Sequence, residues 1–158
     1  MPPPFLFDIS TLDPDHVVLT KEQIYEVLPH RYEMMQLDAI IYNDMEHGVA
    51  AARRDVRSDE FWVRGHIPGR PLLPGVLMIE SAAQLASFFA MKCLNFQASF
   101  LGFGGVDKVK FRESVSPGQR LIILAQMLES RTRRIVFSTQ GVVDGRIAFE
   151  AIITGMPI

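Results

Sequence analysis

Apolar positions recur along the chain with two periods, one typical of helices and one typical of strands. Residues 20–28 start with Thr20, carry Gln23 three positions later and stop before Pro29, a capping-box pattern that predicts a short helix. Alternating patterns predict strands over 35–43, 48–56, 99–112, 119–130, 133–143 and 146–154. The last strand follows Asp144-Gly145, a dipeptide typical of tight hairpins. One long helix, residues 74–93, is apolar on nearly every side. Such a helix must be buried against the antiparallel strands, which predicts an α+β domain.

The polar residues of the long helix share one face. Glu80, Gln84 and Ser87 are four and three positions apart, so they form a single stripe on a helix that is otherwise apolar. A carboxylate in such surroundings is costly unless it is paired or functional, and the pattern leaves both explanations open. Glu80 is therefore a candidate general acid.

A loop rich in proline and glycine precedes the long helix and carries His66. Pro74 is expected to be the first helical residue, where its missing N–H costs nothing. The backbone N–H groups of Gly75 and Val76 would then be free to polarise a carbonyl oxygen and stabilise an enolate. Each feature alone is more often structural, but together they favour a catalytic site.

The residues around this loop follow a longer motif, Gly65-His66-x-Pro68-Gly69-x-Pro71-x-x-Pro74-Gly75-Val76-Leu77-x-x-Glu80-x-x-x-Gln84. It closely resembles the motif of the hot-dog-fold β-hydroxyacyl-acyl carrier protein dehydratases of type II fatty acid synthesis. Leu28–Tyr32, and Gly105–Arg112 with Pro117-Gly118, are similar to two further segments of that family, and the resemblance covers roughly residues 20–154. It implies a hot-dog fold, in which an antiparallel sheet wraps the long helix and two subunits form one continuous sheet.

The resemblance also implies an active site at the dimer interface, where His66 of one chain faces Glu80 of the other. His66 would remove the proton beside the thioester carbonyl, and Glu80 would help to protonate the departing β-hydroxyl group. The Gly75 N–H would hold the thioester oxygen, while the backbone carbonyl of Leu72 would orient the imidazole. The predicted substrate-binding residues are Leu72, Gly75, Val76 and Gln84. A glutamate at position 80 resembles the branch of the family that only dehydrates.

The chain departs from the family pattern at several positions outside the His66/Glu80 pair. Gly102 stands where several relatives have a gating tyrosine, and the other departures are Glu33–Met35, Glu113, Ser114 and Gln119. They leave the acyl chain length, the tunnel gate and the pathway open. Two other functions remain as alternatives: a hot-dog acyl thioesterase, and a non-catalytic acyl-binding subunit that pairs with an active partner.

Composition and charge bear on the number of domains, the class of partner and the cellular location. The chain has 158 residues, of which 48% are hydrophobic, and this fits one domain, residues 20–158, preceded by a proline-containing extended arm, residues 1–19. A net charge of −2 does not favour nucleic acid, and the polar stripe argues against a membrane span. The lone Cys93 fits a reducing compartment, so we expect a cytoplasmic protein.

The expected partners are acyl carrier protein, with its phosphopantetheine-linked acyl chain, and a second copy of this chain, as a homodimer or a trimer of dimers. Basic residues outnumber acidic ones between positions 105 and 134, which predicts either solvated strand edges or a rim that binds the carrier. The four histidines lack a metal-binding spacing, and no cofactor is expected. His30 is predicted to serve packing or the backbone.

Overall fold

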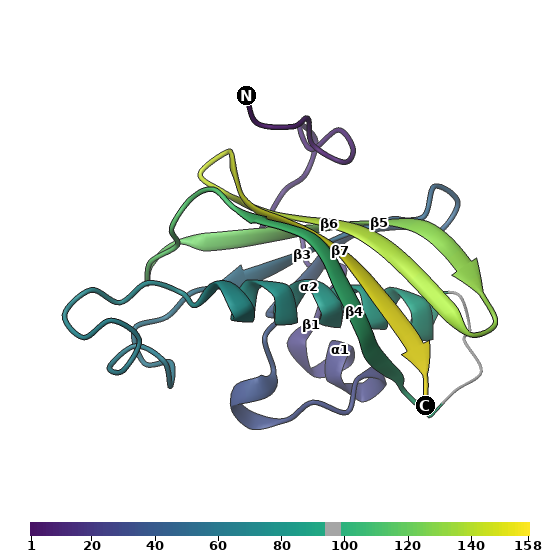
Figure 1. Ribbon diagram of the computed structural model, residues 1–158, viewed down its shortest axis with the longest axis horizontal. Coiled ribbons are helices and arrows are strands. Elements are labelled where there is room, and N and C mark those ends of the chain that lie inside the picture. Colours follow the sequence, from purple (N-terminus) through teal and green to yellow (C-terminus); the bar gives the residue numbers. More distant parts are fainter. Residues whose placement is uncertain (94–98) are drawn as a thin grey trace.

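The computed structural model describes residues 1–93 and 99–158, which form one antiparallel sheet curved around a single long helix (Figure 1). In chain order the elements are β1 (Leu19–Thr20), α1 (Lys21–Val27), the 3-10 helix η1 (Tyr32–Met34), β2 (Ala39–Asp44), β3 (Val49–Asp55), α2 (Gly75–Phe88), the π-helix η2 (Phe89–Cys93), β4 (Leu101–Phe111), β5 (Arg120–Arg131), β6 (Arg134–Val143) and β7 (Arg146–Pro157). The strand order is β1-β2-β3-β5-β6-β7-β4. The predicted α+β hot-dog architecture is confirmed.

Two local predictions are also confirmed. At the start of α1 the Gln23 N–H donates to the Thr20 hydroxyl at 3.3 Å, and the Thr20 N–H donates back to the Gln23 side chain at 2.9 Å. Between β6 and β7, Asp144 and Gly145 have φ angles of 48° and 76°. Two consecutive positive values define the tight hairpin turn that an Asp-Gly pair favours.

The strand predicted over residues 35–43 is shorter than expected, because β2 begins only at Ala39. The backbone N–H groups of Gln36 and Leu37 donate instead to two side chains, the Gln84 amide oxygen at 3.3 Å and the Tyr25 hydroxyl at 2.8 Å. Backbone groups that bond to side chains cannot also bond to a neighbouring strand. This segment therefore supports the site described below rather than the sheet.

The long helix is the core of the domain. Leu85, Phe88 and Phe89 are completely buried under the sheet, and the ring of Phe89 packs edge-on against Phe137 of β6 at 5.7 Å. Each such side chain contributes about 1.5–3 kcal/mol when fully buried. Gly75–Cys93 is long and apolar enough to cross a membrane by length and composition alone, but 61% of that apolar window is buried inside the protein. We therefore assign it as the core helix.

The first residues of the chain lie on the opposite face of the sheet from α2 (Figure 1). The Leu6 N–H donates to the Gln140 side chain at 3.0 Å, and the Gln140 amide donates back to the Pro4 carbonyl at 3.0 Å. Apolar side chains of this segment pack on a small cluster that includes Ile41 and Leu124. The residues predicted as an extended arm thus cover the outer face of the sheet.

Candidate active site

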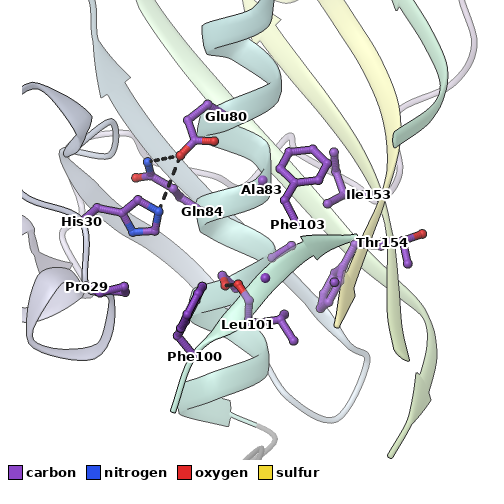
Figure 2. Close-up of a pocket in the computed structure, with 15 residues that line it drawn as sticks. Pro29, His30, Glu80, Ala83, Gln84, Phe100, Leu101, Phe103, Ile153 and Thr154 are labelled. Carbon is purple, nitrogen blue, oxygen red and sulfur yellow. Dashed lines mark hydrogen bonds and ion pairs between the residues drawn. The ribbon is translucent and has the colours of Figure 1, made fainter. Parts of the chain in front are cut away.

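Glu80 lies at a cavity of about 220 Å³ beside α2 (Figure 2). The whole polar stripe predicted from the sequence, Glu80, Gln84 and Ser87, lines this cavity. Its remaining walls are mostly apolar and come from the segment after α1, from α2 and from the paired strands β4, β6 and β7. The other lining residues are Pro29, His30, Ala83, Ala86, Phe100, Leu101, Gly102, Phe103, Phe137, Ile153, Thr154 and Gly155. The cavity therefore combines one carboxylate with walls suited to an apolar chain.

The Gln84 side chain holds the Glu80 carboxylate. Its amide nitrogen donates to Glu80 Oε1 at 2.9 Å and to the Met34 carbonyl at 2.7 Å. Its oxygen accepts from the Tyr25 hydroxyl at 2.7 Å and from the Gln36 N–H at 3.3 Å. All four hydrogen-bonding positions of the amide are thus used by protein groups. Gln84 serves here as a support for Glu80, and its direct contact with substrate stays a prediction.

His30 is a further titratable group at Glu80. Its Nε2 lies 3.5 Å from Glu80 Oε1, with both side chains about three-quarters buried (25% and 23% exposed). Its Nδ1 is buried and makes no hydrogen bond within the described residues. Burial lowers the pKa of His30, against the attraction of Glu80. From the sequence, His30 was predicted to serve packing or the backbone. The signal available was its place in Leu28–Tyr32, a segment that resembles the family.

The His66 imidazole is oriented as the resemblance implies. Its Nδ1 lies 2.7 Å from the Leu72 carbonyl oxygen, which can only accept, so Nδ1 carries the proton and Nε2 is left free to accept one. The His66 N–H donates to the Trp62 carbonyl at 2.8 Å. After His66 the Arg70 N–H closes a turn onto the Ile67 carbonyl at 2.9 Å, a geometry that the Pro-Gly pair between them favours.

The N-terminus of α2 lies in the same pocket as His66. Pro74 is the residue that caps the helix and not its first residue, because its ψ angle of 132° lies outside the helical range. Its carbonyl accepts from the Leu77 N–H at 2.9 Å. Among the described residues the N–H groups of Gly75 and Val76 donate to no protein acceptor. The predicted residues His66, Leu72, Gly75 and Val76 all line this second pocket. It can therefore offer a base together with free N–H donors.

Within one chain the predicted catalytic residues line different pockets. Glu80 and Gln84 belong to the cavity beside β4, whereas His66 belongs to the pocket at the start of α2, and no residue lines both. The Glu80 cavity and the His66 pocket are therefore separate within one chain. In the described ranges 1–93 and 99–158, no group of three or more His, Cys, Asp or Glu could hold a metal ion.

Gly102, which departs from the family pattern, lies in the wall of the Glu80 cavity. A Cβ atom at this position would collide with the side chain of Ile158. The Ile158 backbone is bound there through its N–H, which donates to the Phe100 carbonyl at 3.1 Å. The space beside Gly102 is therefore filled by Ile158, and a tyrosine would not fit without displacing it.

Most of the basic residues predicted as a rim are paired. Arg112 binds Glu150 at 2.9 Å, Arg120 binds Asp15 at 2.9 Å, and Arg131 and Arg134 both bind Glu129. Exposed pairs of this kind contribute little stability, but they lower the positive field of the surface. Arg112 is the one of these arginines that borders the His66 pocket.

A single apolar helix wrapped by an antiparallel sheet, with the His66 loop at the helix N-terminus and a partly buried glutamate along it, defines a protein of the hot-dog class. The model of the FabA-like domain matches residues 28–152, and the chain belongs to that family. It is 37% identical over 139 residues to 3-hydroxyacyl-acyl-carrier-protein dehydratase FabZ of Enterococcus faecalis, a match that covers 87% of this chain and 97% of that protein.

Two further comparisons agree. The dehydratase FabZ of Polynucleobacter necessarius is 32% identical over 138 residues, which cover 87% of this chain and 92% of that protein. Among solved structures, a chain of the dehydratase heterocomplex ApeI:P from Xenorhabdus doucetiae is similar with a TM-score of 0.70 and 18% identity, over 89% of this chain and 91% of that one. The last likeness bears on the fold alone.

Proposed function

We propose that this protein is a hydro-lyase that converts β-hydroxyacyl-acyl carrier protein to the trans-enoyl thioester. The observation that carries the proposal is the state of the two catalytic groups: Glu80 is held by Gln84 at an apolar cavity, and His66 is held by the Leu72 carbonyl with Nε2 free. The names of the two FabZ relatives, both 3-hydroxyacyl-acyl-carrier-protein dehydratases, support the same substrate class.

The reaction uses one base, one acid and one oxygen-binding donor. His66 Nε2 takes the proton from the carbon beside the thioester carbonyl, and the electron pair moves onto the carbonyl oxygen. The free N–H of Gly75 stabilises that oxygen while it is negative. Collapse of the enolate forms the double bond and expels the β-hydroxyl group, which leaves as water with a proton from Glu80. Transfer of the proton from His66 to Glu80 through water then restores both groups.

The proposed reaction uses the Glu80 cavity and the His66 pocket as the two half-sites of one active site, so a second copy of the chain is the expected partner. β4 is the last strand in the sheet order and pairs only with β7 among the described strands. Its exposed edge carries apolar side chains, with Phe103 and Phe111 49% and 51% exposed. Such an edge favours pairing with the same strand of another chain. A homodimer with a continuous sheet would bring His66 of one chain to Glu80 of the other, and a trimer of dimers remains compatible.

The test is incubation of the purified protein with a crotonyl thioester of acyl carrier protein. A dehydratase run in reverse hydrates the double bond, so the enoyl absorbance should fall without release of free thiol. The His66→Ala variant should lose this activity and keep its oligomeric state. Thiol release without hydration would indicate a thioesterase, and absence of either reaction on all acyl lengths would indicate a non-catalytic acyl-binding subunit. Hydration at near-normal rate in His66→Ala would remove His66 from the mechanism.

We also propose the partner and the location: acyl carrier protein, with the acyl chain on phosphopantetheine, would deliver the substrate, and the reaction would take place in the cytoplasm, which fits the lone Cys93.

A further inference from the structure

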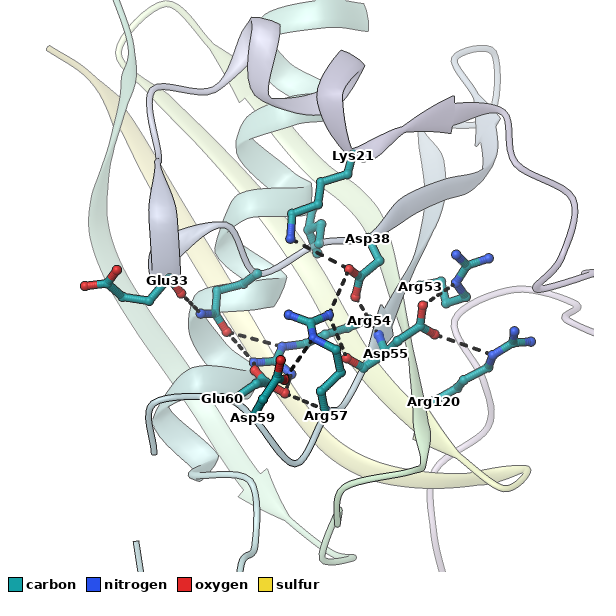
Figure 3. A network of polar contacts seen from close by, with 12 residues as sticks. Lys21, Glu33, Asp38, Arg53, Arg54, Asp55, Arg57, Asp59, Glu60 and Arg120 are labelled. Atoms are coloured by element: carbon teal, nitrogen blue, oxygen red, sulfur yellow. Dashed lines mark hydrogen bonds and ion pairs between the residues drawn. The ribbon is translucent and has the colours of Figure 1, made fainter. Parts of the chain in front are cut away.

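Arg54 of β3 is a buried charge at the centre of a polar network (Figure 3). Its side chain is 2% exposed and reaches two different acceptors. Nη2 donates to Gln36 Oε1 at 2.6 Å and to Glu60 Oε1 at 2.8 Å, and Nε donates to Gln36 Oε1 at 3.2 Å. Burying such a pair costs several kcal/mol per ion before its attraction is counted, so the pair is a weak source of stability. Its position suggests what else it does.

One branch of the network leads to Glu80. Arg54 fixes the Gln36 side chain, which also donates to the Glu33 carbonyl at 2.6 Å. The backbone N–H of the same Gln36 donates to Gln84 Oε1, and Gln84 donates in turn to Glu80 Oε1 at 2.9 Å. The segment that Arg54 anchors is therefore the one that orients the amide holding the catalytic carboxylate.

The other branch leads to the His66 loop. Glu60, which Arg54 binds, accepts from the Trp62 ring nitrogen at 3.3 Å and from the Arg57 N–H at 2.8 Å. Trp62 is 4% exposed, and its backbone carbonyl accepts from the His66 N–H at 2.8 Å. Arg54 thus stands between the turn that precedes the base and the segment that supports the acid, in one chain.

We propose that Arg54 is a positioning residue that fixes Glu80 and the His66 loop of its own chain together; this rests on the proposed dehydratase function. Glu80 and His66 line different pockets of a chain. Each Arg54 would therefore position Glu80 in one active site of the dimer and His66 in the other. A guanidinium is suited to this role, since its planar fork binds two acceptors in fixed directions. A lysine at the same place would keep the charge and hold only one acceptor firmly.

The first test compares Arg54→Lys with Arg53→Lys, a matched control. Arg53 is the neighbouring residue of β3, is 15% exposed and also binds a carboxylate, Asp55, at 3.2 Å, but within the described residues its side chain makes no hydrogen bond or ion pair with either branch. In the dimer, well below the unfolding temperature, Arg54→Lys should lower kcat by about tenfold with KM within about twofold, because misplaced groups act on the chemical step. Arg53→Lys should change kcat by less than about twofold.

A second readout does not depend on turnover. The NMR signals of the histidine ring nitrogens report His30, which lies beside Glu80, and His66. Arg54→Lys should shift both sets of signals, and Arg53→Lys neither. If wild-type protein shows no dehydration but both sets shift, the positioning role stands and the proposed function fails. If the His30 or the His66 signals of Arg54→Lys do not shift, Arg54 does not position both groups. A loss of stability with unchanged kcat in this variant would also contradict the proposal.

Two milder variants guard against misfolding of Arg54→Lys, because each removes one branch. Gln36→Leu removes the acceptor of Arg54 on the Glu80 side and should shift the His30 signals only. Trp62→Phe removes the ring N–H bound to Glu60 and should shift the His66 signals only. Shifts distributed without regard to branch, or absent in both variants, would contradict the proposal.

Discussion

The hydroxyl group of Tyr25 is the most informative single group to remove. It accepts from the Leu37 N–H at 2.8 Å, so its proton must point to Gln84 Oε1, 2.7 Å away. Tyr25 is 3% exposed, and burial raises the pKa of its hydroxyl group, so this donor stays protonated in the physiological range. Tyr25→Phe deletes both hydrogen bonds and keeps the packing of the ring.

The loss of unfolding free energy in Tyr25→Phe can be worked out from the groups that are left unpaired. Leu37 is completely buried, so its N–H loses its partner without gaining water, at about 1–3 kcal/mol. Gln84 Oε1 keeps the Gln36 N–H and loses about 1 kcal/mol of net hydrogen bonding. The sum of about 2–4 kcal/mol lowers Tm by about 4–16 °C for a domain of this size. If the misaligned Glu80 raises the activation free energy by about 1 kcal/mol, kcat falls about fivefold.

The assay is urea unfolding of Tyr25→Phe beside Tyr42→Phe, a matched control. Tyr42 also donates through its hydroxyl group, to Asp44 at 3.3 Å, but at a site that solvent can reach. The control should lose less than about 0.5 kcal/mol. A Tyr25→Phe protein as stable as the control, with unchanged kcat, would refute the claim that this hydroxyl group organises the support of Glu80.

Three further results are expected. His30→Gln should lower kcat by about threefold to tenfold with KM nearly unchanged in steady-state assays, because Glu80 loses a neighbouring imidazole; equal kcat would place His30 outside the site. Since the native state keeps His30 less protonated than the unfolded state does, wild-type stability should fall as pH drops below about 6.5 towards the lowered pKa, and urea unfolding of His30→Gln should show a flatter pH dependence. Gly75→Ala, whose Cβ would lie 2.7 Å from the Phe111 ring, should reduce kcat, and Phe111→Ala should partly restore it; additive losses would contradict this contact.

The sequence predicted those parts of the fold that depend on local periodicity. The apolar helix, the strands after it and the Asp144-Gly145 hairpin all follow from spacing or turn chemistry, and the Glu80 stripe follows from helical geometry. Neither the bonds of Gln36 and Leu37 to side chains nor the late start of β2 at Ala39 could be predicted this way. They depend on Tyr25 and Gln84, which are distant in the chain.

The supporting residues of the site were missed for a related reason. His30 lies in the family-like segment Leu28–Tyr32 and Arg54 in the predicted strand 48–56, but only tertiary packing brings them to Glu80 and to the His66 loop. His30 was predicted from the sequence to serve packing or the backbone, since no spacing in the sequence connects it with Glu80. The pairing of the basic residues was missed for the same reason. Arg112 and Arg120 bind Glu150 and Asp15, which lie outside residues 105–134 in the sequence.

Complementation between two inactive chains tests most directly whether His66 and Glu80 of different chains form one active site. His66→Ala and Glu80→Gln proteins are each purified, shown to be inactive, mixed under conditions in which subunit exchange is measured, and assayed for hydration of a crotonyl thioester. A mixed dimer contains one site with both His66 and Glu80 intact, so activity should recover in proportion to the mixed dimer formed. No recovery despite complete exchange would contradict the claim that the two half-sites of different chains form one active site.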